Sequence, residues 1–594
     1  KTSAGIPKKQ LVRCSLYSYN YHDVPPNFNL DQRIRVQIAD YPKHRGMGKW
    51  RFFRDRGTMG KAFRKLLPHE PSGDYAIFSI TYYQDHTVNG ISGSPSPRQC
   101  LEYIRQRYDA GFRAFSAEID FNFGRLGLAY YLYPKILWNA KMTEDEVEAL
   151  RNRWLQRAFG SGWQKMGEYY DFMSKDRFTV NAPNNWAKAI RLIDAADQLI
   201  DPQKEPGAKA RIDDVKQYWY FYYLVDSGQA RADNPAFREF VWKGQMSYMT
   251  AMHMVTRRLL GSKNRVVDIV KEFSNGPAHY TPEETAAWWE KVKEHWPVVE
   301  VTDFANAVLS DGTRATDVDL FDLVNVEEFQ DAQNRQQPFL YNGSSQRNDI
   351  SFLTRANKAG EDIGFNIHWS WNPQNRHNFD MDVHYGVEYW DPESKSWESL
   401  VDLDTVYQHS EKVTMPDGSV NELVSVRYQA PRPGVYKFDI GRSGDGSRLH
   451  PITYNPVTEE VSGVRGQTYF KNLFGRTQSP AYIYIPKGTT SLDLEVWDRT
   501  KDRKVILHNG LPSYGLTRTR TVDISKRGTH VIPLEAGEDG SIAIIAGDGF
   551  AFPYLYSVPM LWAKSPGELM VPRAIAKADG LTELKDLSSA PVRK

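Results

Sequence analysis

The chain of 594 residues has very little cysteine, and that scarcity restricts the kinds of site it can hold. Only Cys14 and Cys100 occur, and they lack the paired spacing of a zinc-binding motif. Each lies in an apolar segment, and a free cysteine behaves as a small hydrophobic residue. We therefore expect two buried thiols and no cysteine-based metal site.

Long apolar runs, an excess of charge of one sign and phosphate-binding loops are also missing. No apolar run approaches the ~20 residues that a transmembrane helix requires, so no membrane span is expected. The net charge is only +2, which argues against a nucleic-acid partner held by phosphate neutralisation. Neither a glycine-rich phosphate loop nor a nucleophile elbow occurs, which argues against nucleotide-dependent and esterase chemistry. No organic cofactor is implied.

Four β-rich segments recur in the first 140 residues, with helical or loop material between them. They are 11–19, 33–40, 74–82 and 112–120. Most end in clusters of polar and aromatic residues, and the C-terminal ends of parallel strands form the active face of a (β/α)8 barrel. A whole barrel needs roughly 250 residues, so these segments predict only its C-terminal half. The other half either comes from a second polypeptide or has been lost together with the site.

Helical patterns follow this region, and β patterns follow the helices. Ser96 and Gln99 form a capping box at the start of a helix within the first 140 residues, and Thr143 and Glu146 form another at the start of the next region. A last helix is expected to start at Thr281, and helical periodicity continues to Trp296. After Pro297, short β-rich segments separated by turn residues are typical of antiparallel sandwiches. The predicted fold class is therefore multidomain, α/β plus all-β. The expected parts are half of a (β/α)8 barrel at 1–140, an α-helical domain at 141–297, β-sandwiches at 298–448 and 449–575, and a tail at 576–594.

The alternation of side chains along the last strand selects candidate acids. Ala114, Ser116, Glu118 and Asp120 share one face of the strand, and the opposite face is mostly apolar. An apolar face suits packing under outer helices, so Glu118 and Asp120 are expected to point into the barrel at the C-terminal end of the strand.

Cleavage of a glycoside commonly uses two carboxyl groups on opposite sides of one bond. The catalytic candidates are the carboxylates at the predicted strand ends: Glu118, Asp85, Asp40 and Asp120. The substrate-binding candidates are aromatic residues and histidines near the same elements: Tyr17, Tyr19, His22, Tyr82, Tyr83, His86 and Trp138. Alternatively, the carboxylates cap loops or pair with Arg13 and Arg125.

A second cluster of ligand-type side chains lies in the β-rich region. Asp380, Asp382 and His384 alternate, so one strand face would present all three. Calcium prefers a set of oxygen ligands and zinc prefers a compact tetrahedron. A solvated strand face is the favoured interpretation, so we predict no metal and keep these three residues as weak candidates.

A tyrosine-rich stretch follows the last predicted barrel strand. It reads Leu-Ala-Tyr-Tyr-Leu-Tyr-Pro-Lys-Ile-Leu-Trp-Asn at 128–139, and Arg-Ala-Phe-Gly at 157–160 and Met-Gly-Glu-Tyr-Tyr at 166–170 come after it. The pattern resembles the end of the catalytic module in secreted bacterial glycoside hydrolase-like proteins with an α-glucuronidase-like (β/α)8 barrel, many of them still called domains of unknown function. In that family a tyrosine-rich helix ends in a Leu-Trp-Asn or Leu-Trp-Asp turn. A helical domain then begins with a Phe/Tyr-Gly step and a Tyr-Tyr pair. The resemblance covers roughly residues 11–260.

The resemblance implies a secreted, periplasmic or cell-surface protein that is active on carbohydrate. By position, Glu118 and Asp85 stand where functional acids lie. Related barrels usually place a general acid after the fourth strand, and the segments here count as strands five to eight. No residue of this chain takes that role, so the rest of the barrel is expected from another polypeptide.

The leading hypothesis is a glycoside hydrolase-like protein that acts on a complex polysaccharide by carboxylate acid/base catalysis, with uronic acids among the candidate sugars. Two alternatives stay open. One is a non-catalytic extracellular scaffold or glycan-binding protein. The other is a polysaccharide lyase, in which a pair such as Tyr83 and His86 abstracts a proton next to a uronic acid.

Overall fold

The computed structural model describes the chain, with gaps, between Cys14 and Leu584. In several strands, among them the first four, it describes the backbone alone. The described residues are 14–18, 34–39, 76–79, 94–109, 114–117, 123–175, 182–245, 249, 268–269, 271–273, 275–329, 339–341, 350–370, 383–407, 411–414, 420–442, 452–456, 469–470, 481–496, 502–511, 518–547, 553–563 and 566–584. They form two compact units, one that ends at Val298 and one that begins at Val299.

The first unit begins with a four-stranded sheet whose order along the sheet is the order along the chain, β1-β2-β3-β4. All three pairings between neighbouring strands are parallel, as predicted for βα units. Within the described residues the sheet stays open and no closed barrel forms. The strands are β1 Cys14–Ser18, β2 Ile34–Ala39, β3 Ala76–Ser79 and β4 Ala114–Ala117.

Helix α2 (Pro97–Asp109) connects β3 to β4 and begins with the local signal expected for it. The backbone N–H of Gln99 donates to Ser96 Oγ at 3.2 Å, and the backbone N–H of Ser96 donates to Gln99 Oε1 at 2.8 Å. This reciprocal capping box satisfies two N–H groups that the first turn of a helix leaves without partners. Cys100 is fully buried on this helix, as expected for a structural thiol, and Cys14 lies in β1, where only the backbone is described.

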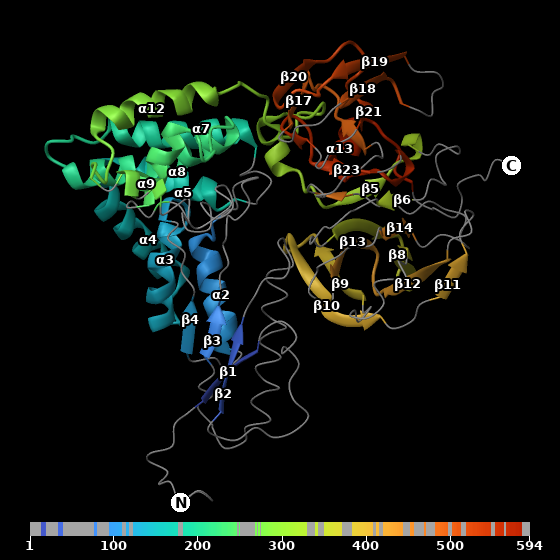
Figure 1. Cartoon of the computed structure of the whole chain (residues 1–594). Coiled ribbons are helices and arrows are strands. Elements are labelled where there is room, and N and C mark those ends of the chain that lie inside the picture. The colour runs from blue at the N-terminus through green and yellow to red at the C-terminus, as the bar shows by residue number, and fades with distance from the viewer. Residues whose placement is uncertain are drawn as a thin grey trace, which may run out of the picture. The chain divides into compact units, whose positions relative to one another are not determined.

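Helices make up the rest of the first unit (Figure 1). They are α3 Phe123–Trp138, α4 Glu144–Phe159, α5 Trp163–Met173, α7 Pro183–Gln198, α8 Pro206–Asp226, α9 Pro235–Gln245 and α12 Pro282–His295. Helix α8 is central, because it packs against α3, α4, α7, α9 and α12. Capping boxes start α4 at Thr143 and α12 at Thr281, as the sequence predicts.

Aromatic side chains form the centre of this helical bundle. Trp219 on α8 is fully buried, and its ring contacts Tyr169, Trp186 and Trp296 with centroids 6.3 to 6.5 Å apart. Rings that meet edge to face bury a large apolar area, and each pair adds about 0.5–1.5 kcal/mol beyond that burial. Much of the tryptophan and tyrosine in this part of the chain therefore serves as core.

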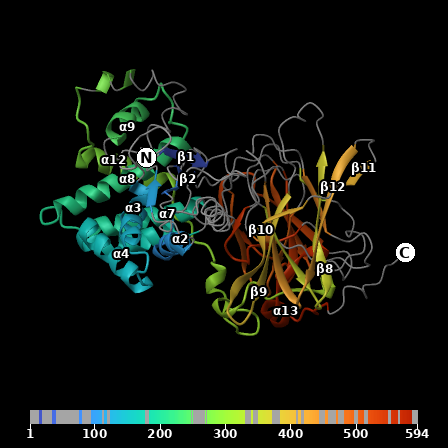
Figure 2. The ribbon, with the colours of Figure 1, turned by 90° about the horizontal axis from the view of Figure 1, so that it is seen from below.

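The second unit consists of antiparallel sheets, as the turn-rich sequence predicts (Figures 1 and 2). One sheet has the order β10-β9-β13-β7 and another has the order β11-β12-β8-β14-β6. Their strands are β6 Phe339–Tyr341, β7 Ile350–Ala356, β8 Glu361–Ser370, β9 Val383–Asp391, β10 Ser396–Tyr407, β11 Glu411–Thr414, β12 Val420–Ala430, β13 Gly434–Arg442 and β14 Ile452–Pro456. Because β14 pairs with β8, the first group of strands extends beyond residue 448.

The later strands build two further principal sheets, β16-β21-β18-β19 and β20-β17-β22. One apolar core, which includes Phe438 and Leu494, joins the earlier strands to the later ones. The strands are β16 Ala481–Ile485, β17 Ser491–Val496, β18 Lys504–Asn509, β19 Arg518–Asp523, β20 Gly528–Pro533, β21 Ser541–Ala546 and β22 Tyr554–Leu555. We find that the two predicted sandwiches share apolar packing.

The described part of the predicted tail is well packed. Helix α13 (Arg573–Ala578) contributes Ile575 to a second core that also contains Phe304 and Phe329. Just after this helix, the buried Asp579 accepts hydrogen bonds from Tyr484 Oη at 2.8 Å and from the backbone N–H of Lys487 at 2.9 Å. The polar composition of 576–594 does not reveal this buried anchor, because the donors that make burial of Asp579 possible are distant from it along the chain.

Candidate active site

The C-terminal edge of the parallel sheet is the place where the sequence predicts a site. Because β1 to β4 run parallel, their C-terminal ends lie at one edge. Glu118 follows the last residue of β4 in the sequence, Asp40 follows the last residue of β2, and Tyr19 follows the last residue of β1. Strand order thus brings the last described residues before Tyr19, Asp40 and Glu118 to a common edge.

Most of the predicted site residues lie outside the described residues. The catalytic candidates there are Glu118, Asp85, Asp40 and Asp120. The substrate-binding candidates there are Tyr19, His22, Tyr82, Tyr83 and His86. Tyr17 lies in β1, where the backbone alone is described and Tyr17 is in register with Gln37 of β2. Their roles remain predictions.

The beginning of α3 is the first described structure that follows Glu118 in the sequence. Arg125, in the first turn of this helix, is fully buried. Beside it, the hydroxyl of the buried Tyr169 donates to the carbonyl oxygen of Gly124 at 3.1 Å. A Cβ atom at Gly124 would come within 2.6 Å of Tyr218 Cβ, so only glycine lets α3 approach α8 this closely. These contacts fix the first turn of α3.

Charge and burial act in opposite directions on Tyr169. Burial raises the pKa of the Tyr169 phenol well above its usual range, while a hydrogen bond with Trp219 and the positive charge of Arg125 lower it. The phenol therefore stays protonated at neutral pH and acts as a hydrogen-bond donor.

Trp138, the remaining substrate-binding candidate, has a fully described side chain. It is 92% exposed and ends α3, a helix of 16 residues. At 1.5 Å per residue, Trp138 lies about 22 Å along the helix axis from Phe123, the residue nearest to β4. That separation does not favour contact with a sugar bound at the strand ends, so we leave Trp138 out of the proposed catalytic site.

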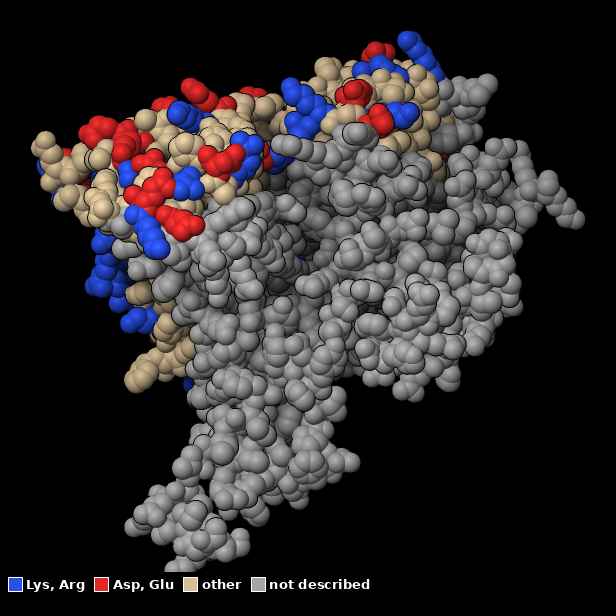
Figure 3. All heavy atoms as spheres, in the orientation of Figure 1, with Lys and Arg blue, Asp and Glu red and all other residues tan. Residues whose placement is uncertain are grey.

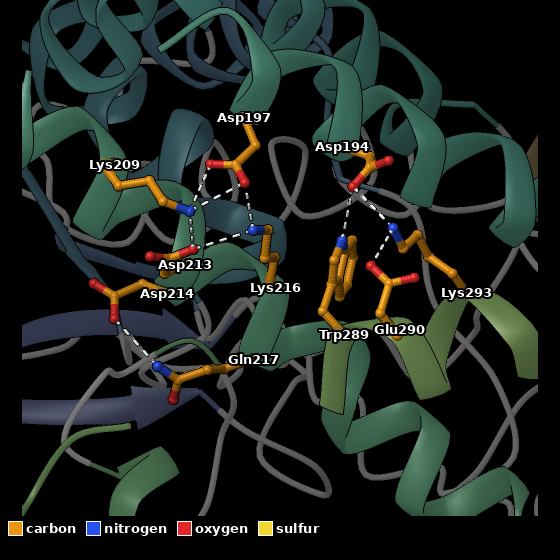
Figure 4. Close-up of polar contacts among 10 residues, drawn as sticks. All are labelled: Asp194, Asp197, Lys209, Asp213, Asp214, Lys216, Gln217, Trp289, Glu290 and Lys293. Carbon is orange, nitrogen blue, oxygen red and sulfur yellow. Dashed lines mark hydrogen bonds and ion pairs between the residues drawn. The ribbon is translucent and has the colours of Figure 1, made fainter. Parts of the chain in front are cut away.

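A network of ion pairs between α7 and α8 is a feature that the sequence analysis missed (Figure 4). Lys216 is only 3% exposed, and its Nζ lies 2.7 Å from Asp197 Oδ2 and 3.1 Å from Asp213 Oδ1. Lys209 Nζ lies 2.8 Å from the same two carboxylates. Burial raises the pKa of Asp197, but hydrogen bonds from Lys209 and Lys216 and their charges outweigh burial and lower it. The spacing Lys209, Asp213, Lys216 on one helix face is the sequence signal for half of this network.

The network continues through Trp289 to helix α12 (Figure 4). Lys216 Nζ lies 5.6 Å from the centroid of the Trp289 ring, and the indole N–H of Trp289 donates to Asp194 Oδ1 at 3.1 Å. Lys293 pairs with the same Asp194 at 3.4 Å and with Glu290 at 2.7 Å. Each of these lysines contacts a carboxylate, so the network holds three helices together and shows no group poised for catalysis.

Asp214, beside this network, differs from its neighbours. Burial and the charge of Asp213 raise the pKa of Asp214 to about 6, and Arg211 opposes them. Gln217 Nε2 donates a hydrogen bond to Asp214 Oδ1 at 3.3 Å, and no cation lies within 4.0 Å of Asp214 in the described part of the chain. An acid with this pKa can exchange a proton near neutral pH, and its helical position sets it apart from the strand-end candidates.

Metal binding finds no support in the part of the chain that the structure covers. No three His, Cys, Asp or Glu side chains among the described residues are close enough to hold an ion. The weak candidates Asp380 and Asp382 lie outside the described residues, and His384 lies in β9, where its side chain is not described. Across the described helices, none combines the length and apolar character required to span a bilayer.

Comparison with known proteins gives a distant result. No protein-family model matches the chain, and no curated protein sequence matches it. Among solved structures, the chain is similar to a family GH115 4-O-methyl-α-glucuronidase with specificity for decorated arabinogalactans, with 12% identity and a TM-score of 0.28. The alignment covers 75% of this chain and 58% of the enzyme, so the chain spans less than two thirds of the enzyme's length. At this TM-score the similarity carries no argument about the site or its chemistry.

Proposed function

We propose that the chain is part of a secreted, glycoside hydrolase-like protein that acts on a complex polysaccharide. The observation that supports this proposal is the all-parallel sheet β1-β2-β3-β4, because it brings the C-terminal ends of four strands to one edge. In β/α enzymes that edge carries the chemistry. Glu118 and Asp85 are the proposed acid/base pair, with Asp40 and Asp120 as alternates.

The proposed mechanism uses two carboxyl groups. One carboxylic acid donates a proton to the leaving oxygen of the glycosidic bond, and the other either attacks the anomeric carbon or activates water for that attack. The tyrosines and histidines near the strand ends would bind the sugar rings: Tyr17, Tyr19, His22, Tyr82, Tyr83 and His86. The reaction needs no organic cofactor and no metal.

A second polypeptide is proposed to complete the sheet. Among the described residues, β1 and β4 each pair with a single strand, so each presents one unpaired edge. An exposed edge invites pairing with another strand. Parallel βα units from a partner would satisfy both edges and supply the first four strands of the barrel. Native mass spectrometry of the purified assembly should then show a second chain.

The test of catalysis is Glu118→Gln in the native assembly, assayed by release of reducing ends from polysaccharides that contain uronic acids. Loss of a general acid or base lowers turnover by about 10²–10⁴-fold, so we expect at least a hundredfold loss. Glu168→Gln is the matched control, because Glu168 is half exposed on α5 and should be neutral to activity. Full turnover by Glu118→Gln would remove this residue from the mechanism. Products that absorb in the ultraviolet as unsaturated uronides would instead identify a lyase.

A further inference from the structure

The surface formed by α3 and α4 differs in charge from the remainder of the helical unit. Segment 121–143 contains no aspartate or glutamate, and neither does the second half of α4. Four exposed cations lie on these elements: Lys135, Lys141, Arg153 and Arg157. In the described part of the chain no carboxylate comes within 4.0 Å of any of them. Exposed cations that no carboxylate neutralises favour an anionic ligand.

Exposed apolar side chains lie on the same two helices. Trp138 is 92% exposed, Phe123 is 37% exposed and Leu137 is 36% exposed. Phe123, Tyr130 and Leu137 are seven residues apart, so they share one face of α3. The ring of Tyr130 contacts that of Phe123 edge to face at 5.4 Å. An exposed aromatic stripe of this kind marks an interaction surface.

Contacts between the helices place the cations beside this stripe. The rings of Tyr131 on α3 and Trp154 on α4 stack with centroids 6.4 Å apart. Arg153 and Arg157 are one turn apart on α4, on either side of Trp154 in sequence. Figure 3 shows that the described surface of α3 and α4 carries Lys and Arg among uncharged atoms. Lys135 Nζ lies 5.9 Å from the centroid of Tyr131, so its cation contacts an aromatic ring, and no carboxylate of the described residues lies within 4.0 Å of it.

We infer that the α3–α4 surface, defined by Phe123, Tyr130, Lys135, Leu137, Trp138, Lys141, Arg153 and Arg157, binds an acidic polysaccharide whose sugars carry carboxylates. Flat aromatic rings stack on the C–H faces of sugar rings, while ammonium and guanidinium groups pair with the carboxylates. The inference rests on the proposed function and names its substrate class. The surface lies on α3, α4 and the turn between them and includes none of the residues proposed for catalysis, so it is an accessory binding surface.

The test is calorimetric titration of the full assembly with oligogalacturonate and with the same oligosaccharide after reduction of its carboxyl groups. We expect binding to the acidic form and at least a tenfold weaker affinity for the reduced form. Trp138→Ala should weaken binding about five- to tenfold. Arg153→Gln/Arg157→Gln should weaken it about tenfold and flatten its dependence on salt. The control Lys204→Gln/Arg231→Gln removes two exposed, ion-paired charges elsewhere and should leave the affinity unchanged.

The outcomes separate this surface from the catalytic proposal. Equal affinity for both oligosaccharides, or full affinity in both variants, would overturn the inference, as would a change of oligomeric state that shows a second copy on this surface. Binding is measured without turnover. If Glu118→Gln does not reduce hydrolysis, that result contradicts the catalytic proposal and does not affect the proposed binding surface. Conversely, loss of binding in Trp138→Ala with full hydrolysis of a short substrate supports an accessory role.

Discussion

Two groups of basic residues in the helical unit behave in opposite ways. Lys209, Lys216 and Lys293 lie between helices, and each contacts carboxylates at 2.7 to 3.4 Å. The cations on α3 and α4, such as Arg153, are exposed and have no such partner among the described residues. Burial explains the difference, because a charge removed from water must be neutralised whereas a hydrated charge remains available for a ligand. The first group therefore stabilises the fold and the second is free to bind.

Removal of the buried charge of Lys216 is the strongest test of the difference between these two groups of basic residues. Lys216→Met leaves Asp197 and Asp213 with Lys209 alone in a site that is almost closed to water. Breaking a buried pair costs about 3–5 kcal/mol, so we expect a loss of about 3 kcal/mol in the free energy of unfolding, measured with urea. Lys204→Met, at an exposed ion pair, should change it by less than about 0.5 kcal/mol. Equal effects would show that the network adds nothing specific.

Two adjacent aspartates, Asp213 and Asp214, test how pairing with lysine changes the contribution of a carboxylate to stability. Asp213→Asn removes a carboxylate that pairs with Lys209 and Lys216, so stability at pH 8 should fall by about 1–2 kcal/mol. Asp214→Asn removes a half-buried carboxylate that has no lysine within 4.0 Å among the described residues, so stability at pH 8 should rise by about 1–2 kcal/mol.

The effect of Asp214→Asn should depend on pH in a defined direction. The folded pKa of Asp214, about 6, lies above the ordinary value for aspartate. Protonation therefore stabilises the folded state fully below the unfolded pKa, and this contribution is lost as the pH rises through 6. The advantage of the asparagine variant should disappear below about pH 4. Urea unfolding at pH 4, 6 and 8 measures this, and a pH-independent difference would contradict the assignment.

The smallest expected effect is on the exposed surface. Trp138→Ala and Arg153→Gln should each change the free energy of unfolding by less than about 0.5 kcal/mol, because both side chains are exposed. Thermal unfolding of the assembly is the measurement. A large destabilisation of either variant would mean that the surface is a packing interface. The exposed residues would then contribute to stability as the buried Lys216 does.

Local sequence signals predicted the elements of this protein well. The capping boxes at Ser96, Thr143 and Thr281 start helices where the sequence places them. Residues within four positions of one another make these signals, so no knowledge of the fold is required. Parallel pairing of β3 with β4 follows from helix α2, because a crossover helix between two strands returns the chain in the same direction.

The site could be predicted only in outline. The sequence indicates which carboxylates follow strand ends, but the pairing of Lys216 with Asp197 joins two helices across a loop. Sequence composition also did not reveal that β14 belongs to the first group of strands or that Asp579 is an anchor for Tyr484. Each of these depends on residues that are distant along the chain, which a local pattern does not report.

The sequence by itself determined the order of parallel strands, helices and antiparallel strands, because side-chain periodicity, caps and turns are local properties. Only the tertiary structure decided which charges are neutralised and which are exposed. The lysine at 216 and the arginine at 153 look alike in the sequence, yet one lies against two carboxylates and the other against solvent. Burial is set by the neighbours that folding brings together, and it alone separates a stabilising charge from one that is available to bind.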